Sequence, residues 1–166
     1  MAGKRDWLDA GLALLAEQGA PAVTIERLAD GLGLSKGSFY HHFKGMTGFR
    51  TALLEHFEAE RTTRFVEQAE AAGGDRLDAL LKLVLAPGRW LELEIAVRAW
   101  ALQDAEARAV QERVDRTRLA YLTEISGDAD LALALFLVVV GAGQVLPPPS
   151  GRQLKNALEL VLGRRK

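Results

Sequence analysis

Apolar residues recur with the period of an α-helix along most of the 166-residue chain, and no stretch shows the sustained alternation of a β-strand. Glycine and proline interrupt this pattern, most clearly at Gly19, Gly33, Gly73-Gly74 and Pro87-Gly88. Where both ends are marked, the expected helices span residues 5–18, 36–42, 47–72, 90–103 and 105–125. The sequence therefore predicts an all-α fold of about nine helices.

Two of the predicted helices are short and are joined by a glycine. Thr24 is suited to cap the first, Gly33 interrupts the chain, and Ser35 is suited to cap the second. This pattern is typical of a helix-turn-helix, in which the first helix crosses the DNA backbone and the second enters the major groove. We therefore predict a three-helix, homeodomain-like head over residues 1–46 and a C-terminal helical bundle over residues 47–166.

The second short helix has one apolar and one polar face. Phe39 and Phe43 are four residues apart, so both can anchor the helix to the two helices before it. The opposite face then carries Lys36, Gly37, Tyr40, His41 and Lys44. Glycine costs a helix about 1 kcal/mol relative to alanine, so Gly37 makes sense if the backbone must lie close to base edges.

Charge is unevenly distributed along the chain, although its sum is only −1. No acidic residue occurs between Asp30 and Glu55, where Lys36, Lys44 and Arg50 all fall. This segment can present the positive face that DNA binding requires. Cysteine is absent, no apolar signal segment opens the sequence, and the most apolar run, residues 131–146, is short for a bilayer span. These features predict a cytoplasmic protein with no membrane contact.

The pair Leu28-Ala29 and the run Gly33-Leu34-Ser35-Lys36-Gly37-Ser38-Phe39-Tyr40-His41-His42-Phe43-Lys44 resemble the signature of the TetR family of transcriptional regulators. The resemblance covers about the first fifty residues, and the remainder resembles the family only in its helical architecture. It implies a repressor that binds a palindromic, double-stranded DNA operator as a homodimer. It also implies release of the operator when a small-molecule effector enters the C-terminal domain, and it implies no cofactor.

The resemblance assigns DNA contacts to individual residues. Phosphate contacts fall to Thr24, Tyr40, His42 and Lys44, base-edge contacts to Lys36, Gly37, Ser38 and His41, and Ser35 and Thr47 complete the predicted surface. Lys36 is the best candidate for reading a guanine. Met46 is a departure, because the family commonly has a lysine at this position. The N-terminus of the following helix and the Thr47 hydroxyl could still hold a phosphate there.

Plainer alternatives exist for three of these residues or pairs. His41-His42 could belong to a metal site, but adjacent helical residues point apart and no third ligand is near, so no metal is expected. Tyr40 could be an ordinary boundary aromatic residue. The Thr24 hydroxyl could simply cap its helix, which is compatible with a phosphate contact.

An effector site is expected in the helices that follow Asp75. Its predicted lining residues are Trp90, Glu94, Val97, Arg98, Trp100 and Tyr121. An aromatic stripe is also typical of protein core, and Arg98 could pair with Glu94 four residues earlier. Tyr121 fits a pocket wall or ordinary packing.

The last two helices carry more apolar surface than one hairpin can hide. The first begins at Asp130 and is stopped by the three prolines at 147–149, and the second opens with a capping box from Ser150 to Gln153. The predicted dimer-interface residues are Leu131, Leu135, Val138, Val139, Leu154, Leu158, Val161 and Leu162. Two such hairpins about a two-fold axis would form a four-helix interface, with Gly141 and Gly143 allowing close approach. The alternative is that they form the core of a monomer.

Two other function classes compete with a ligand-responsive repressor. An enzyme is not expected, because the sequence shows no Ser/His/acid group, metal-ligand spacing, phosphate-binding glycine loop or dinucleotide motif. The other is a helical interaction protein whose C-terminal domain binds a partner protein and has no small-molecule effector.

Overall fold

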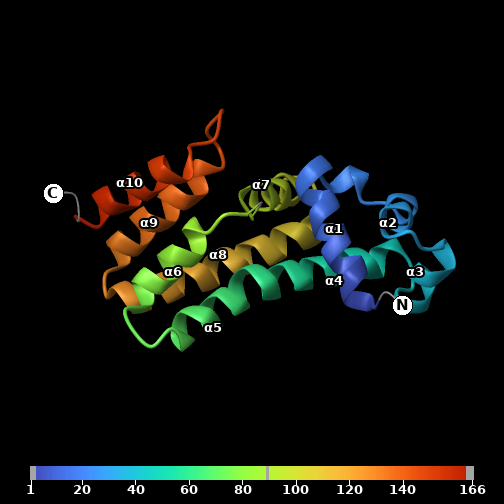
Figure 1. The fold of residues 1–166 in the computed structure, drawn as a ribbon, viewed down its shortest axis with the longest axis horizontal. Helices are drawn as coiled ribbons and strands as arrows, with labels where there is room; N and C mark the ends of the chain where they lie inside the picture. Colours follow the sequence, from blue (N-terminus) through green and yellow to red (C-terminus); the bar gives the residue numbers. More distant parts are fainter. Residues whose placement is uncertain (1–2, 89, 164–166) are drawn as a thin grey trace. The chain divides into compact units, whose positions relative to one another are not determined.

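The computed structural model describes residues 3–88 and 90–163, and the regular secondary structure of these residues is entirely helical (Figure 1). The elements are α1 (Lys4–Gln18), η1 (Ala20–Ala22), α2 (Ile25–Leu32), α3 (Lys36–His42), α4 (Met46–Glu58), η2 (Ala59–Thr63), α5 (Arg64–Ala71), α6 (Arg76–Leu85), α7 (Trp90–Ala101), α8 (Ala105–Ser126), α9 (Ala129–Ala142) and α10 (Gly151–Val161). Because α4, η2 and α5 follow one another without a break, the described ranges hold nine separate α-helical segments. The predicted all-α fold is confirmed.

Helix ends lie close to their predicted places, with three differences. A π-helical turn, η2, interrupts the predicted long helix in its middle. Helix α7 ends at Ala101, earlier than expected, and the Arg108 side chain donates to the carbonyls of Ala101 and Leu102 just beyond it. Helix α9 ends at Ala142, before the prolines, in a turn where the Gly143 N–H donates to the Val140 carbonyl.

The chain forms two compact units, one of residues 1–60 with 89–112 and the other of residues 61–88 with 113–166. The first unit therefore contains more than the predicted head, because it includes α4, α7 and the start of α8. Helix α7 packs along α1 within this unit. A helix predicted to belong to the C-terminal bundle thus contacts α1 of the predicted head.

Aromatic residues form the core of the first unit. The ring of Phe39, which is fully buried, lies 5.5 Å from that of Trp7, 5.1 Å from that of Phe43 and 5.4 Å from that of Phe49. A Cβ atom on Gly11 would lie only 2.8 Å from the Phe49 ring, so α1 and α4 approach each other more closely than an alanine would allow. This packing fixes α3 against α1 and α4.

Helices of the second unit pack in pairs, α5 against α6 and α9 against α10, and α10 also contacts α6. Its buried apolar side chains include those of Leu77, Leu135, Leu154 and Leu158. Arg76 at the start of α6 pairs with Glu70 of α5 and Glu124 of α8. Among the described residues, no helix is both long enough and apolar enough to cross a membrane.

Candidate nucleic-acid interface

Local hydrogen bonds define the two short helices of the head. The Thr24 hydroxyl accepts from the Arg27 N–H at 3.3 Å, and the Ser35 hydroxyl accepts from the Ser38 N–H at the same distance. Between the helices, Gly33 has a φ of 65°, a left-handed conformation that favours glycine. Both predicted caps are present, so a hydroxyl, a glycine and a second hydroxyl set the length and the turn of the motif.

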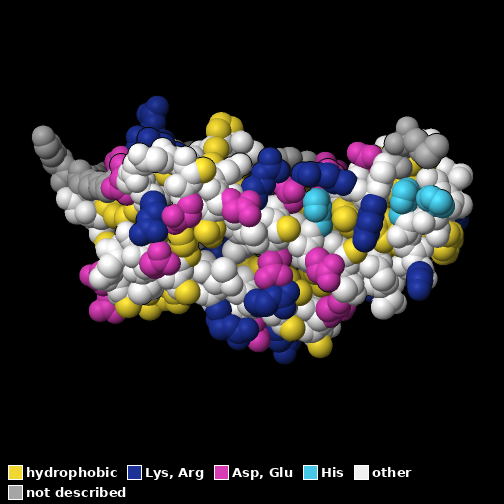
Figure 2. Space-filling model, turned by 90° about the horizontal axis from the view of Figure 1, so that it is seen from below, with side chains coloured by type: hydrophobic (Ala, Val, Ile, Leu, Met, Phe, Trp, Pro, Cys, Tyr) yellow, Lys and Arg dark blue, Asp and Glu magenta, His cyan; other side chains and the backbone are white. Residues whose placement is uncertain are grey.

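The polar face of α3 points outward because two phenylalanines hold the other face. Phe39 is 0% and Phe43 5% exposed, whereas Tyr40, between them, is 60% exposed. Exposed side chains on or beside this helix are those of Ser35, Lys36, Tyr40, His41 and Lys44, with Ser38 and His42 half-buried. On the face shown in Figure 2, histidine side chains and single lysine or arginine side chains lie at the end of the molecule that holds α2 and α3. The surface predicted to meet DNA is accessible.

Glycine at position 37 has no explanation inside the unit. A Cβ atom there would meet only the Ser35 hydroxyl, at an ordinary contact distance of 3.6 Å. Its backbone is helical, so alanine would fit and would favour the helix. Packing within the unit therefore does not require glycine at position 37. The predicted requirement, close approach of DNA to the α3 backbone, is compatible with this geometry.

An ion pair that the sequence reasoning missed joins α2 to α3. The Lys36 ammonium lies 2.5 Å from a carboxylate oxygen of Glu26, and both side chains are 59% exposed. The hydrogen bond from Lys36 lowers the pKa of the Glu26 carboxyl, and the same bond raises the pKa of the Lys36 ammonium. Glu26 lies just before the acid-free segment, and its ten-residue separation from Lys36 corresponds to no helical spacing. Only the turn at Gly33 brings the two together.

The start of α4 is the remaining part of the predicted DNA surface. Thr47 is exposed, Met46 is half-buried, and Gly45 precedes the helix without a side-chain cap. The first turn of such a helix presents N–H groups that can hold a phosphate. The geometry is compatible with the predicted phosphate site, and no lysine stands there.

Five of the six predicted effector residues lie on α7, in the first unit. Val97 and Glu94 are buried, and Trp90, Arg98 and Trp100 are half-buried. Tyr121 belongs to the second unit, where its hydroxyl donates to Glu70 at 2.8 Å. Burial and this hydrogen bond raise the pKa of Tyr121 to about 12. The Tyr121 hydroxyl is therefore already engaged by Glu70 within the second unit.

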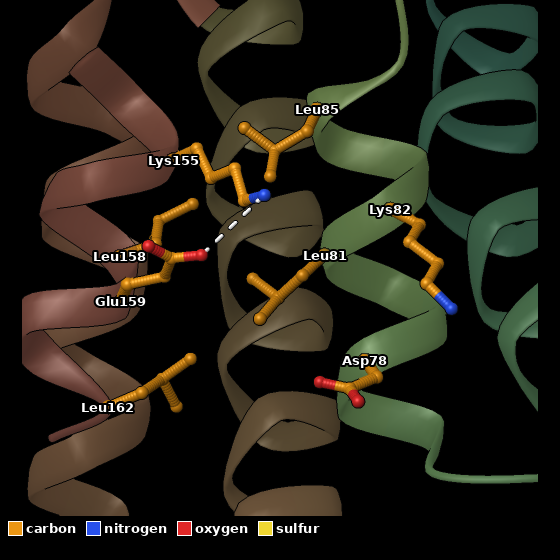
Figure 3. A pocket seen from close by; sticks show the side chains of 8 residues that line it. All are labelled: Asp78, Leu81, Lys82, Leu85, Lys155, Leu158, Glu159 and Leu162. Atoms are coloured by element: carbon orange, nitrogen blue, oxygen red, sulfur yellow. Dashed lines mark ion pairs between the residues drawn. The ribbon is translucent and has the colours of Figure 1, made fainter. Parts of the chain in front are cut away.

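A groove of about 390 Å³ in the second unit lies between α6 and α10 (Figure 3). Leu81, Leu85, Leu158 and Leu162 provide its apolar walls, and the Lys155–Glu159 ion pair of 3.6 Å lies beside it. None of the predicted effector residues is among its described lining residues. The groove and the predicted effector site are therefore different places.

The predicted dimer residues divide into two groups. Leu135, Leu154 and Leu158 are buried within the second unit, as the monomer-core alternative requires, and Leu131, Val138, Val139, Val161 and Leu162 are half-buried. The apolar side chains that these helices expose belong instead to Leu133, Leu137 and Leu160, with exposed fractions of 43%, 57% and 60%. Leu133 and Leu137 were not predicted, because α9 is apolar on all sides and the sequence does not show which side faces inward. Leu160 was not predicted because it lies outside the apolar stripe of α10.

Known regulatory proteins are similar to this chain in sequence. Residues 8–53 match the family model described as bacterial regulatory proteins, tetR family. The HTH-type transcriptional repressor Rv1474c of Mycobacterium tuberculosis (strain ATCC 25618 / H37Rv) is 29% identical, and the match covers 96% of this chain and 91% of that protein.

Two solved structures share the fold over nearly the whole chain. A transcriptional regulator from Rhodococcus sp. Rha1 gives a TM-score of 0.77 at 18% identity, covering 98% of this chain and 95% of its own. A transcriptional regulator from Saccharomonospora viridis, solved in complex with choline, gives 0.74 at 20% identity, covering 98% and 96%. The solved structures show the shared fold, and the family-model match together with the Mycobacterium tuberculosis repressor supports a regulator of the TetR family.

Proposed function

We propose that this chain acts as a homodimeric repressor that binds an inverted-repeat operator through α2 and α3 and releases it on binding a small molecule. The observation that carries the proposal is the polar face of α3, exposed at Lys36, Tyr40 and His41 and held in place by buried Phe39 and Phe43. A short helix fixed in this way can enter a major groove without losing its orientation. We place this activity in the cytoplasm and propose no catalytic step.

The test is titration of the purified protein against fluorescent inverted-repeat duplexes taken from the DNA that flanks its own coding region. The wild-type protein should bind one of them specifically, and the double substitution Lys36→Ala with Tyr40→Ala should weaken that binding on the order of 100-fold. Arg116→Ala on α8 removes an exposed cation outside this surface and serves as the matched control. Absence of specific binding to any such duplex at low salt would refute the operator proposal.

The dimer proposal is supported by the apolar side chains of Leu133, Leu137 and Leu160. Exposed leucines on two packed helices are typical of a surface that a partner covers. An inverted repeat also requires two recognition helices about 34 Å apart, which one subunit cannot supply. Sedimentation of the purified protein tests this directly, since a monomer at operator-binding concentrations would contradict it.

The effector proposal is supported by the contact between α7 and α1. A ligand that moves α7 would also move α1 and the head. This direct contact would carry the movement without the long helix formed by α4, η2 and α5. The choline complex of the Saccharomonospora viridis regulator shows that a neighbour of this fold is found with a small molecule. Choline is therefore the first probe for a thermal-shift screen.

A true effector must weaken operator binding, and the operator must weaken effector binding by the same factor, typically 5- to 150-fold. A compound that binds the protein yet leaves operator affinity unchanged would contradict its role as an effector. If operator binding is confirmed and the screen gives no such compound, the chain is a regulator that senses no small molecule of the screened classes. A chain that binds a protein but no duplex would instead be the interaction protein considered above.

A further inference from the structure

Glu26 lies within the predicted DNA surface, although its charge is opposite to what DNA attracts. It is two residues after Thr24, a predicted phosphate contact, and its carboxylate pairs with Lys36, the predicted base contact. The 2.5 Å pair spans the helix-turn-helix from the first turn of α2 to the first turn of α3. A carboxylate at such a place needs a reason, because it repels every phosphate that comes near.

Held against Glu26, the Lys36 ammonium is less available to a phosphate. Contacts between lysine and phosphate provide most of the affinity for DNA of any sequence, whereas base contacts provide the preference for one sequence. The Glu26 carboxylate therefore disfavours binding in which Lys36 contacts only a phosphate of the DNA backbone. Repulsion of wrong partners is a common source of specificity.

The same pair is complementary to one kind of base pair. In the major groove, guanine presents the acceptors O6 and N7, and the cytosine opposite presents the N4 donor. Lys36 offers a donor and Glu26 an acceptor, side by side. An A·T pair also presents an acceptor and a donor, N7 and N6 of adenine, but its purine offers the Lys36 ammonium one acceptor where guanine offers two.

We propose that Glu26 is a specificity-determining residue that acts together with Lys36 as one donor–acceptor unit, selecting a G·C pair in each half-site and disfavouring contact with phosphate. The inference rests on the proposed operator binding. It adds that an acidic residue, absent from the predicted DNA contacts, decides which sequence is bound.

The experiment is selection of half-site sequences from a randomised inverted repeat, followed by binding measurements with specific and unrelated duplexes over a range of salt. The position read by Lys36 is the one whose G·C preference disappears in Lys36→Ala. Glu26→Ala should reduce the preference at that same position about tenfold. It should also strengthen binding to unrelated DNA, with a salt slope steeper by about 0.9 per subunit, because Lys36 becomes free to contact a phosphate.

Asp30→Ala is the matched control, since it removes one acidic charge from the same helix. Asp30 is exposed, and its charge acts on the Lys36 ammonium through space, raising the pKa of Lys36. Glu26→Gln separates the two effects: it keeps an acceptor oxygen and loses the charge. It should therefore retain the G·C preference while strengthening binding to unrelated DNA.

The outcomes separate failure of operator binding from failure of the role of Glu26. If the wild-type protein selects no inverted repeat, the operator proposal itself fails. If the wild-type protein selects one and Glu26→Ala keeps both its preference at the Lys36 position and its affinity for unrelated DNA, only the role of Glu26 is overturned. Thermal unfolding of each variant checks that the head remains folded, as expected for substitution of an exposed residue.

Discussion

Helices α3 and α9 use apolar residues in opposite ways. Helix α3 has seven residues, and its single fully buried side chain, Phe39, lies next to the exposed Tyr40. Helix α9 has fourteen residues, almost all apolar, so that Leu135 at 1% and Leu137 at 57% exposure are chemically the same. In α3, side-chain chemistry decides which side faces the core. In α9, only the neighbouring helices decide it.

The difference has a functional meaning. A recognition helix must keep one orientation while it binds and releases DNA, so its two faces differ strongly. A helix that is apolar all round can pack against its own unit and against a second subunit at once. In α3, substitutions on the two faces should affect stability and operator binding separately. In α9, substitutions on the two sides should affect stability and dimer formation separately.

The largest effect is expected at the buried face of α3. Phe39→Ala should lower the free energy of unfolding by about 3–5 kcal/mol, because it opens a cavity among the rings of Trp7, Phe43 and Phe49. Tyr40→Ala, one residue away, should change it by less than about 1 kcal/mol and should instead weaken operator binding. Urea denaturation and duplex titration measure the two quantities. Similar losses of stability for both variants would show that the two faces are not distinct.

In α9 the corresponding contrast lies between two leucines. Leu135→Ala should destabilise the chain by about 2–5 kcal/mol, since this side chain is buried among neighbouring helices. Leu137→Glu should leave the helical content intact and convert the proposed dimer to a monomer, as measured by sedimentation. A Leu137→Glu protein that remains dimeric would place the subunit contact elsewhere.

A substitution at Gly37 tests whether glycine is needed there for DNA binding and not for the stability of the fold. Gly37→Ala should raise the free energy of unfolding by up to about 1 kcal/mol while weakening operator binding. Gly31→Ala on α2 gives the control: a Cβ atom there also meets no neighbour, so it should stabilise the chain without affecting DNA. If Gly37→Ala binds the operator as the wild type does, close backbone approach at this residue is not needed.

The smallest effect is expected at the first residue of α4. Met46→Lys should restore one phosphate contact per subunit and steepen the slope of log affinity against log salt by about 0.9 per subunit. Leu102→Lys adds the same charge at a position that is 76% exposed and outside the predicted surface. Equal slopes for the Met46→Lys and wild-type proteins would mean that this helix end does not contact DNA.

Much of the head could be predicted from the sequence because its signals are local. Thr24, Gly33 and Ser35 act on their own or adjacent turns, and the spacing of Phe39 and Phe43 separates buried from exposed residues without reference to the remainder of the fold. The predicted extent of α3, residues 36–42, is confirmed, because both of its ends depend on such local signals. In α9 the residues are apolar on every side, so their spacing marks no buried face, and in α10 Leu160 lies outside the apolar stripe of that helix. The prediction therefore included Leu135, Leu154 and Leu158, which are buried, and missed Leu133, Leu137 and Leu160, which are not.

By itself, then, the sequence determined the helices, their caps and the polar face of the recognition helix, since each depends on residues within a few positions of one another. Only the tertiary structure decided that Gly11 is needed where α1 meets α4, that α7 packs on α1, and that Glu26 holds Lys36. These features join residues that are distant along the chain. Their contacts depend on how whole helices pack, and no local pattern of residue types records that packing.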